Sequence, residues 1–316
     1  MSPLVESILF VFGLVALGYL VAMSGYLAAR VGDALTDFVV GVALPVLLFK
    51  TMLEADFSGT NPWLIWAAYY PAAAIAWIAA HLMTAKLFGR DAREAVVGGV
   101  SGVFSNLLLL GLPLMLSAFG TAGTEVLALI IAVHLPIMMA ASIILMEWAR
   151  RDEAGPLKPG RIAGQFLRNL IGNPFVVGIL LGLAWRETGL EMPALGDRFV
   201  NTFAALAGPV ALFGMGLSLR HLGVRGDLRP ALALSAVKIV LMPAVALVLV
   251  KLFGLPPFPA RIVVVAAAMP AGVNPYLIAT RFGVGKALAS NTMTVSTVLA
   301  VATSAFWLFV AEAVLD

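Results

Sequence analysis

The chain has 316 residues, of which 61% are hydrophobic and 12% charged, and it contains no cysteine. A chain with this many hydrophobic residues has more apolar surface than a soluble domain buries. The composition therefore indicates an all-helical, polytopic membrane protein. The lack of cysteine excludes disulfides, thiolate metal sites and cysteine nucleophiles. The net charge of +3 does not suggest nucleic-acid binding, because the basic residues lie in loops, where orientation in the membrane explains them.

Ten apolar stretches, separated by short polar or Gly/Pro-containing links, predict ten transmembrane helices in a single domain, 1–316. The first stretch lacks a basic start and a small-residue cleavage site, so we interpret it as a retained helix rather than a signal peptide. The predicted spans are 4–23, 34–53, 63–88, 94–118, 125–148, 170–186, 198–220, 230–252, 261–281 and 288–312.

Lysine and arginine are distributed unevenly between the two sets of loops. If both termini lie on the same side, fourteen basic residues fall in the loops of one side and five in those of the other. Because basic residues accumulate on the cytoplasmic side, we expect both termini to be extracytoplasmic. The longest link, 150–168, carries five of the fourteen and separates two halves, 4–149 and 169–312.

The two halves share short patterns in the same order, which predicts a duplicated five-span unit. Because five is odd, the second copy would enter the membrane inverted. Inverted repeats with a broken helix in each copy are typical of secondary transporters with a site near the membrane midplane. The matches are Pro45–Phe49 with Pro209–Phe213, Lys86–Gly89 with Lys251–Gly254, Arg93 with Arg261, Asn106 with Asn274, and Phe119–Gly120 with Phe282–Gly283, at offsets of 163 to 168 residues.

The ninth span is interrupted in its middle by Pro270, Gly272, Asn274 and Pro275. Proline removes backbone donors and clashes with the preceding turn, so this span is predicted to be two half-helices. We expect Asn274 to cap the second half and Pro275 to occupy its first position. The exposed N-terminus of that half-helix would be partly positive and would favour an anion.

The fourth span is expected to break in the same way and to cross the ninth. It is rich in glycine, and its Ser-Asn pair could cap a second half-helix. The alternative is ordinary glycine-mediated helix packing, which the match to the ninth span makes less favoured. We expect a substrate site formed by Ser105, Asn106, Gly272, Asn274 and Pro275, with helix breaks at Gly102, Gly111, Pro113 and Pro270.

Two ionisable residues lie deep inside predicted spans. Lys238 is too far from the span end to snorkel easily; it is either a fixed cation that supports the crossing or attracts substrate, or a lysine satisfied by carbonyls at a break. His134 could relay protons or could be a neutral packing residue. The remaining Asp, Glu and His residues lack metal-ligand spacing, so neither a metal nor a cofactor is expected.

An enzymatic function is not expected. Gly216-Leu-Ser218-Leu lacks the second glycine of a nucleophile elbow, and the sequence has neither His-Glu-x-x-His nor paired intramembrane aspartates. One alternative is a sodium-coupled organic-anion symporter of the bile-acid-transporter type. Sodium sites need clustered oxygen ligands, however, and the crossing offers no mid-membrane carboxylate. Another alternative is a membrane sensor built on a carrier fold.

The motifs resemble those of the auxin efflux carrier family, which includes plant PIN-type exporters and bacterial organic-acid permeases. The segment Asn106–Pro113 looks like the family's Asn-(four residues)-Gly-x-Pro pattern, and Pro270–Pro275 looks like its Pro-x-Gly-x-x-Pro pattern. Lys238 precedes Pro243-Ala-Val by five residues, as a basic residue does in that family. Unlike the plant pattern, this chain has Ser105 where a proline precedes the first asparagine.

The resemblance implies an elevator-type carrier in the cell's inner or plasma membrane, moving a small organic anion such as a carboxylate or an auxin-like acid. Spans 3–5 and 8–10 would form the moving transport domain, and spans 1, 2, 6 and 7 the scaffold and the contact of a homodimer. From the residues themselves we expect sodium-independent transport, with Lys238 standing in for a coupling cation. The expected partners are the substrate, the lipid bilayer and a second copy of the chain.

Overall fold

The structure is a computed structural model that describes residues 3–56, 61–149, 160, 164, 167–168, 170–219, 226 and 228–315. These residues form α-helices, π-helical turns and loops, and their only β-type pairing is an isolated bridge between Ser105 and Ala271. The predicted all-helical fold is therefore confirmed for the described part of the chain. Most of the predicted link 150–168 lies outside the described residues.

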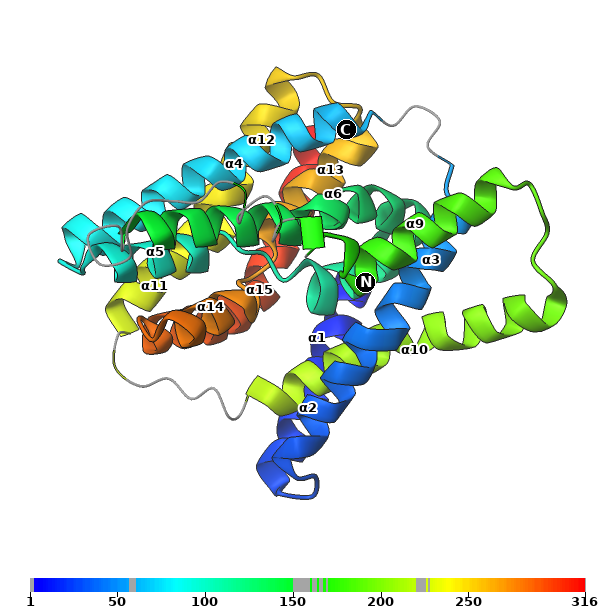
Figure 1. The fold of residues 1–316 in the computed structure, drawn as a ribbon, viewed down its shortest axis with the longest axis horizontal. Helices are drawn as coiled ribbons and strands as arrows, with labels where there is room; N and C mark the ends of the chain where they lie inside the picture. Colours follow the sequence, from blue (N-terminus) through cyan, green and yellow to red (C-terminus); the bar gives the residue numbers. More distant parts are fainter. Residues whose placement is uncertain are drawn as a thin grey trace. The chain divides into compact units, whose positions relative to one another are not determined.

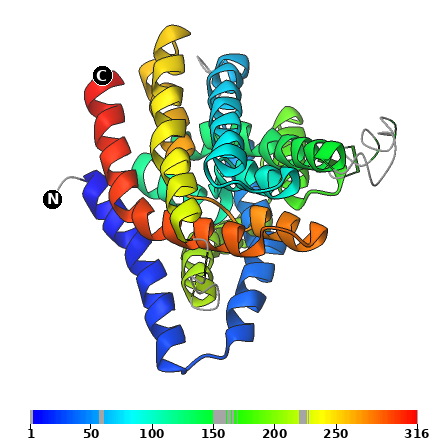
Figure 2. The same cartoon turned by 90° about the vertical axis from the view of Figure 1, so that its left-hand side faces the viewer.

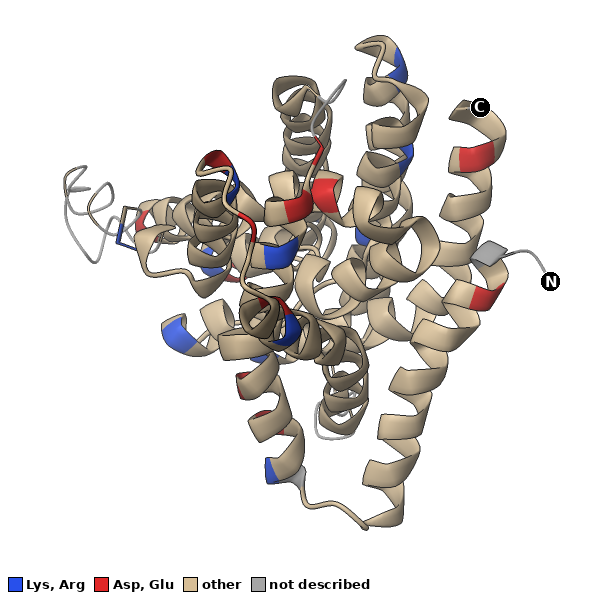
Figure 3. Cartoon of the chain, turned by 90° about the vertical axis from the view of Figure 1, so that its right-hand side faces the viewer, with Lys and Arg blue, Asp and Glu red and all other residues tan. Residues whose placement is uncertain are grey.

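Seven helical stretches of the described chain are long and apolar enough to cross a membrane. Figure 3 shows that the charged residues lie mainly near helix ends and in loops, leaving long uncharged stretches between them. The chain thus has the architecture of a multi-pass membrane protein. The seven stretches are Val5–Ser24, Arg30–Glu54, Pro62–Leu87, Leu107–Ala149, Ala194–Leu219, Leu228–Leu252 and Lys286–Leu315.

The other predicted spans are built from shorter helices. In place of an unbroken ninth span the structure has α13 (Pro257–Ala268) and α14 (Asn274–Phe282), and the predicted fourth span begins with α5 (Ala92–Ser101). Helices of this length reach roughly half the thickness of the hydrocarbon core, about 30 Å. The predicted sixth span is α9 (Pro174–Glu187), which has only 14 residues. Both expected breaks are therefore real interruptions of the helical backbone.

The chain divides into two compact units. Unit 1 contains Met1–Asn61, Leu107–Val133 and Asn169–His221, and unit 2 contains Pro62–Asn106, His134–Arg168 and Leu222–Asp316. Helix α6 (Leu112–Ala149) contributes to both units and is kinked at Gly120, whose φ of 63° lies in the left-handed region. That kink separates the predicted fourth and fifth spans.

Unit 1 is held together by glycines at which two helices approach closely. Helix α1 (Pro3–Ser24) packs along α10 (Ala194–Leu219), and α3 (Leu44–Glu54) packs along α9 (Figure 1). A Cβ atom at Gly18 would overlap the carbonyl oxygen of Phe213, and one at Gly216 would overlap that of Val15, so neither position has room for a side chain. The elements of this unit are α1 (Pro3–Ser24), α2 (Ala29–Phe38), the π-helical turn η1 (Val39–Ala43), α3 (Leu44–Glu54), the π-helical turn η3 (Leu107–Gly111), the first part of α6, α9, and α10 (Ala194–Leu219).

Replacing Gly18 with valine is expected to destabilise unit 1 by about 1–3 kcal/mol, because the added atoms must push α1 away from α10. Gly13 lies on the same helix with nothing within 4 Å of its would-be Cβ, so Gly13→Val is the matched control. Thermal unfolding of the purified protein, followed by size-exclusion chromatography, should show a lower midpoint for Gly18→Val alone. Equal midpoints for the two variants would contradict the assigned contact.

Unit 2 packs its helices around α13 and α15 (Lys286–Leu315). Helix α4 (Pro62–Leu82) lies beside α12 (Met242–Leu252), and α15 lies beside α11 (Leu228–Ala236) and α13 (Figures 1 and 2). The side chain of Asp91 caps α5 by accepting hydrogen bonds from the backbone N–H groups of Arg93 and Glu94. The elements of this unit are α4 (Pro62–Leu82), the π-helical turn η2 (Met83–Leu87), α5, the rest of α6, α11 (Leu228–Ala236), the π-helical turn η5 (Val237–Leu241), α12 (Met242–Leu252), α13, α14 and α15 (Lys286–Leu315).

Three of the π-helical turns are followed, two residues later, by proline: Pro45 after η1, Pro113 after η3 and Pro243 after η5. A proline within a helix cannot donate a hydrogen bond and clashes with the carbonyl four residues earlier, and a wider turn relieves that clash. In η5 the carbonyl that Pro243 leaves without its helical donor is that of Ile239. It accepts a hydrogen bond from the indole nitrogen of Trp307 at 2.8 Å instead.

Candidate functional site

The two helix breaks cross each other inside unit 2. The backbone N–H of Asn106 donates to the carbonyl oxygen of Pro270 at 2.8 Å, and the N–H of Gly272 donates to that of Phe104 at 2.9 Å. These two bonds form the antiparallel bridge between Ser105 and Ala271. Backbone groups that the breaks remove from helical pairing are thus satisfied by each other, as burial in a membrane protein requires.

Helix α14 begins at this crossing without a capping side chain. The predicted cap is wrong by one residue: Val273 is the N-cap, and Asn274 and Pro275 are the first two helical residues. The bridge ends at Gly272, so the chain can already turn into a helical conformation at Val273 (φ −74°, ψ −23°). Because valine has no acceptor, the positive end of α14 stays open to an anion, and the half-exposed Asn274 stands at its start.

Lys238 contacts the C-terminal end of α13, the half-helix that precedes the break. It is fully buried in η5, and its ammonium donates to the carbonyl oxygen of Ala267 at 2.7 Å and to Met242 Sδ at 3.4 Å. Ala267 is in the last turn of α13, where carbonyls lack helical donors and a cation is favourable. Of the alternatives raised by the sequence, a lysine that holds a broken end by its carbonyl is therefore observed, and the same ammonium also places a positive charge beside the crossing.

His134, Tyr69 and Phe104 form an aromatic cluster against the first break. The His134 ring meets the rings of Phe104 and Tyr69 edge to face, with centroid distances of 5.1 and 5.7 Å. The hydroxyl of Tyr69 donates to Ser105 Oγ at 3.0 Å. Ser105 is therefore held by α4, in addition to its place in the bridge.

The remaining predicted break residues take different places. Gly102 is the C-cap of α5, and a Cβ there would overlap Ala80 on α4, so it serves both the break and the helix packing. Gly111 ends η3 and Pro113 is the second residue of α6, so both lie in helical backbone beyond the break. The prediction of a break at these two residues is wrong, because the π-helical turn accommodates the proline without interrupting the helix.

The sequence assigns no supporting role to three residues that hold the crossing or its second half-helix. Tyr69 is one of them, through its hydrogen bond to Ser105. Ser296 on α15 accepts a hydrogen bond from the N–H of Ala271 at 3.0 Å, and Arg93 donates to the carbonyl oxygen of Phe282, the last residue of α14, at 3.0 Å. Ser296 belongs to an unusual polar run, 290–297, at the start of an otherwise apolar helix, and that run was an available signal.

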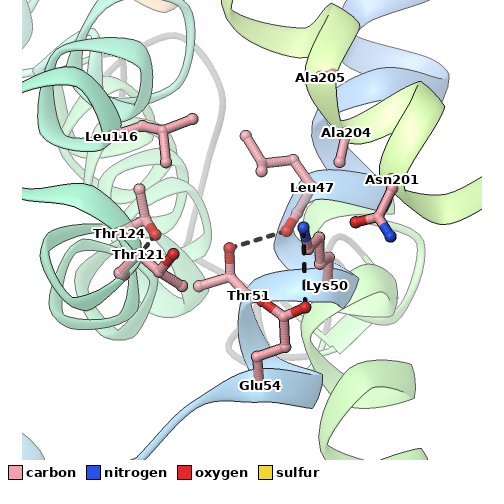
Figure 4. A pocket seen from close by; sticks show the side chains of 10 residues that line it. All are labelled: Leu47, Lys50, Thr51, Glu54, Leu116, Thr121, Thr124, Asn201, Ala204 and Ala205. Carbon is pink, nitrogen blue, oxygen red and sulfur yellow. Dashed lines mark hydrogen bonds and ion pairs between the residues drawn. The ribbon is translucent and has the colours of Figure 1, made fainter. Parts of the chain in front are cut away.

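Unit 1 contains a separate cavity of about 140 Å³ (Figure 4). Its charged groups, Lys50 and Glu54, form an ion pair at 3.8 Å, and its Thr51 and Thr124 hydroxyls donate to carbonyls of their own helices. The cavity therefore offers no net charge to a ligand. Its lining residues are Leu47, Lys50, Thr51, Glu54, Leu116, Thr121, Thr124, Asn201, Ala204 and Ala205.

The crossing differs from that cavity in its electrostatics. Among the buried residues that the structure describes, Lys238 is the only lysine, arginine, aspartate or glutamate. Within the described ranges no three His, Asp or Glu side chains are grouped closely enough to hold a metal ion. The crossing therefore combines an uncompensated positive charge with an open helix N-terminus, and it is the better candidate for binding a small anion.

The chain is similar to a known protein family and to several known proteins. Residues 3–308 match the family described as membrane transport protein. A Rhizobium meliloti protein named "Putative malonate transporter" is 29% identical, with 96% of this chain and 94% of the relative covered. An "Uncharacterized transporter" of Methanothermobacter thermautotrophicus is 24% identical, with 96% of each chain covered. The mouse "Lysosomal cholesterol signaling protein" is 23% identical over 69% of this chain and 26% of its own length.

Proposed function

Because the chain belongs to the membrane transport protein family, that of the auxin efflux carriers, we propose that it is a secondary carrier for a small organic anion. The resemblance inferred from the motifs is thus confirmed at the level of the family, whose members are membrane transporters rather than enzymes. The observation that carries the proposal is that two positive groups flank the same crossing: the buried Lys238 ammonium at the end of α13 and the uncapped N-terminus of α14.

The chemistry of the crossing supports a carboxylate as the substrate. A carboxylate can accept hydrogen bonds from the free backbone N–H groups at the start of α14, and Lys238 supplies charge compensation in an apolar surrounding. The side-chain amides of Asn106 and Asn274 supply polar groups beside it, and Ser105, Gly272 and Pro275 complete the proposed site by setting the course of the backbone at the crossing. The name of the Rhizobium relative supports a short dicarboxylate such as malonate.

We propose ten spans arranged as two inverted repeats. Local geometry supports the repeats: Gly89 and Gly254, which end matching Lys-Leu-Phe-Gly segments, both have φ of 63°. Gly120 and Gly283, which follow matching phenylalanines, have φ of 63° and 73°. Because only glycine adopts such angles without strain, equivalent glycines in equivalent turns are expected of a duplicated unit.

An elevator mechanism is part of the same proposal, with a moving transport domain on a scaffold that also forms a homodimer. Unit 2 contains α4, α5 and α11–α15, and unit 1 contains α1–α3, α9 and α10, which supports the division between transport and scaffold spans. The segment Leu107–Val133 groups with unit 1, so the proposed moving part is smaller than spans 3–5 and 8–10 together.

Flux measurements in proteoliposomes test the proposed function. Radiolabelled malonate should accumulate faster in vesicles that contain the protein than in empty vesicles, and excess unlabelled malonate should compete. A panel of monocarboxylates, dicarboxylates and auxin-like acids, each with and without sodium, separates the proposed carrier from a sodium-coupled symporter. Saturable binding without flux would favour the sensor alternative, to which the name of the mouse relative gives some support.

The proposed orientation, with both termini extracytoplasmic in the cell's inner or plasma membrane, is tested by cysteine labelling. The native chain has no cysteine, so Gly155→Cys and Ala122→Cys each introduce a single reactive site. Position 155 lies outside the described residues. An impermeant maleimide applied to whole cells should label Ala122→Cys and should leave Gly155→Cys unlabelled until the membrane is opened. The reverse pattern would overturn the orientation.

A further inference from the structure

Arg93 occupies an unfavourable place in its own helix. It is the second residue of α5, and the N-terminus of a helix is partly positive, so an arginine there opposes the helix dipole. Asp91 already caps this helix, so the Arg93 side chain is not needed to start it. The position of Arg93 therefore calls for an explanation outside α5.

The guanidinium of Arg93 reaches the far end of α14. Its Nη2 donates to the carbonyl oxygen of Phe282 at 3.0 Å, and within the described part of the chain this is the only hydrogen bond or ion pair that the guanidinium makes. Phe282 is the last residue of α14, where carbonyls lack helical donors and a positive charge is favourable. Arg93 therefore serves the C-terminal end of α14 rather than its own helix.

One turn further along α5, Val97 packs against the turn that follows α14. A Cβ atom added at Gly285 would lie 2.9 Å from Val97 Cγ1, so the backbone passes close to that side chain. Gly283 and Gly285 both have positive φ, which makes a tight turn directly after α14. Arg93 and Val97, four residues apart, thus present one face of α5 to the end of α14.

The half-helices α5 and α14 are therefore joined at both ends. At the crossing, the N–H of Gly272 donates to the carbonyl oxygen of Phe104, and at the far ends Arg93 donates to Phe282. The segments between these two bonds have nearly equal lengths, since Phe104 lies eleven residues after Arg93 and Phe282 lies ten residues after Gly272. Because the chain runs toward the crossing in α5 and away from it in α14, the two half-helices form a closed antiparallel pair.

We propose that Arg93 is a positioning residue for anion binding: by holding the end of α14 against α5, it fixes the free backbone N–H groups at the start of α14. This inference rests on the proposed function and adds to it a residue that does not touch the substrate. Helix α14 is a short rod of nine residues, so release of its C-terminal end lets it tilt about the bridge at Gly272. A site whose donors must first be ordered binds its ligand less tightly.

Removing the guanidinium is therefore expected to raise the KM for malonate without lowering the maximal flux. A hydrogen bond from a charged group shifts an equilibrium by roughly tenfold to a hundredfold, so Arg93→Met should raise the dissociation constant and the KM about tenfold. The maximal flux per folded protein should stay unchanged, because Arg93 does not contact the proposed substrate site. Proteoliposome flux over a range of malonate concentrations, together with calorimetric binding, measures these quantities.

Two further variants separate the hydrogen bond from the charge. Arg281→Met removes a positive charge from the same end of α14, but Arg281 is exposed and its guanidinium lies over the Phe282 ring, 5.8 Å from the centroid, so the KM should not change. Arg93→Lys keeps the charge and a donor and should recover part of the affinity. Hydrogen exchange of the α14 amides should be faster in Arg93→Met and native-like in Arg281→Met.

The outcomes separate this inference from the proposed function. If the native protein carries none of the tested carboxylates, both are overturned. If it carries malonate and Arg93→Met has a native KM, or loses only maximal flux, the positioning role alone is overturned. An equal rise of the KM in Arg281→Met would assign the effect to charge and likewise overturn that role. If Arg93→Met does not fold, Arg93→Lys decides: a raised KM with full maximal flux supports the role, and any other result overturns it.

Discussion

Replacing Lys238 with methionine is expected to abolish transport while leaving the protein folded. Lys238 is the buried cation beside the crossing, and methionine retains most of its volume while removing the charge. At an effective dielectric constant of about 20 and a separation of about 6 Å, the attraction between two unit charges is about 3 kcal/mol, or roughly 100-fold in affinity. A loss of that size in carboxylate flux at low substrate concentration is the expected result.

Stability should change much less than transport. Removing the ammonium leaves the carbonyl of Ala267 without its donor, which costs about 1–3 kcal/mol, but it also removes the cost of burying a charge, which is of similar or larger size. These two effects oppose each other. The melting temperature of Lys238→Met should therefore stay close to that of the native protein, and a large decrease would mean that the lysine is needed mainly to support α13.

Two further variants sharpen this test. Lys238→Arg keeps the charge and should retain part of the flux, although the larger guanidinium must fit between Ala267 and Met242. Lys251→Met makes the same substitution at the exposed end of α12 and should leave flux unchanged. If Lys238 stands in for a coupling cation, replacing sodium by choline should not affect the native protein. Sodium-dependent flux, or full activity of Lys238→Met, would rule the role out.

The sequence was informative about the broken helices because proline, glycine and asparagine impose backbone rules that do not depend on tertiary context. Pro270 and Gly272 marked one break, and Ser105 and Asn106 marked the other, through its repeat match. The start of α14 was misplaced by one residue because the end of the bridge, a long-range feature, determines where the helix can begin. Element boundaries set by tertiary pairing of this kind cannot be read from local capping preferences.

The π-helical turns and the supporting side chains were not predictable for a different reason. The rules for proline in α-helices predict a break at Pro113, whereas η3 adds a wider turn that tolerates the ring. Tyr69 lies among apolar and aromatic residues, away from the polar residues near the end of its span, and its role depends on where Ser105 comes to lie. Lys238 stands out in the sequence because a charge at that depth is costly, but its partner, Ala267, is 29 residues away along the chain.

Introducing a carboxylate at the start of α14 is expected to have opposite effects on stability and on transport. Asn274 is the first residue of this uncapped half-helix, where an acidic side chain interacts favourably with the helix dipole by about 0.3–1 kcal/mol. Asn274→Asp should therefore melt at a temperature equal to or above that of the native protein. The same negative charge would occupy the place proposed for the substrate carboxylate and repel it, so the flux should fall at least about tenfold.

Alanine variants separate the charge from the amide. Since Asn274 makes no cap, Asn274→Ala should leave stability nearly unchanged, and Asn106→Ala should keep the hydrogen bond to Pro270, which comes from the backbone N–H. If the two amides contact the substrate, flux should still be lost in both alanine variants. Normal flux in both would mean that only the backbone of the crossing binds substrate, whereas normal flux in Asn274→Asp would show that the anion binds elsewhere.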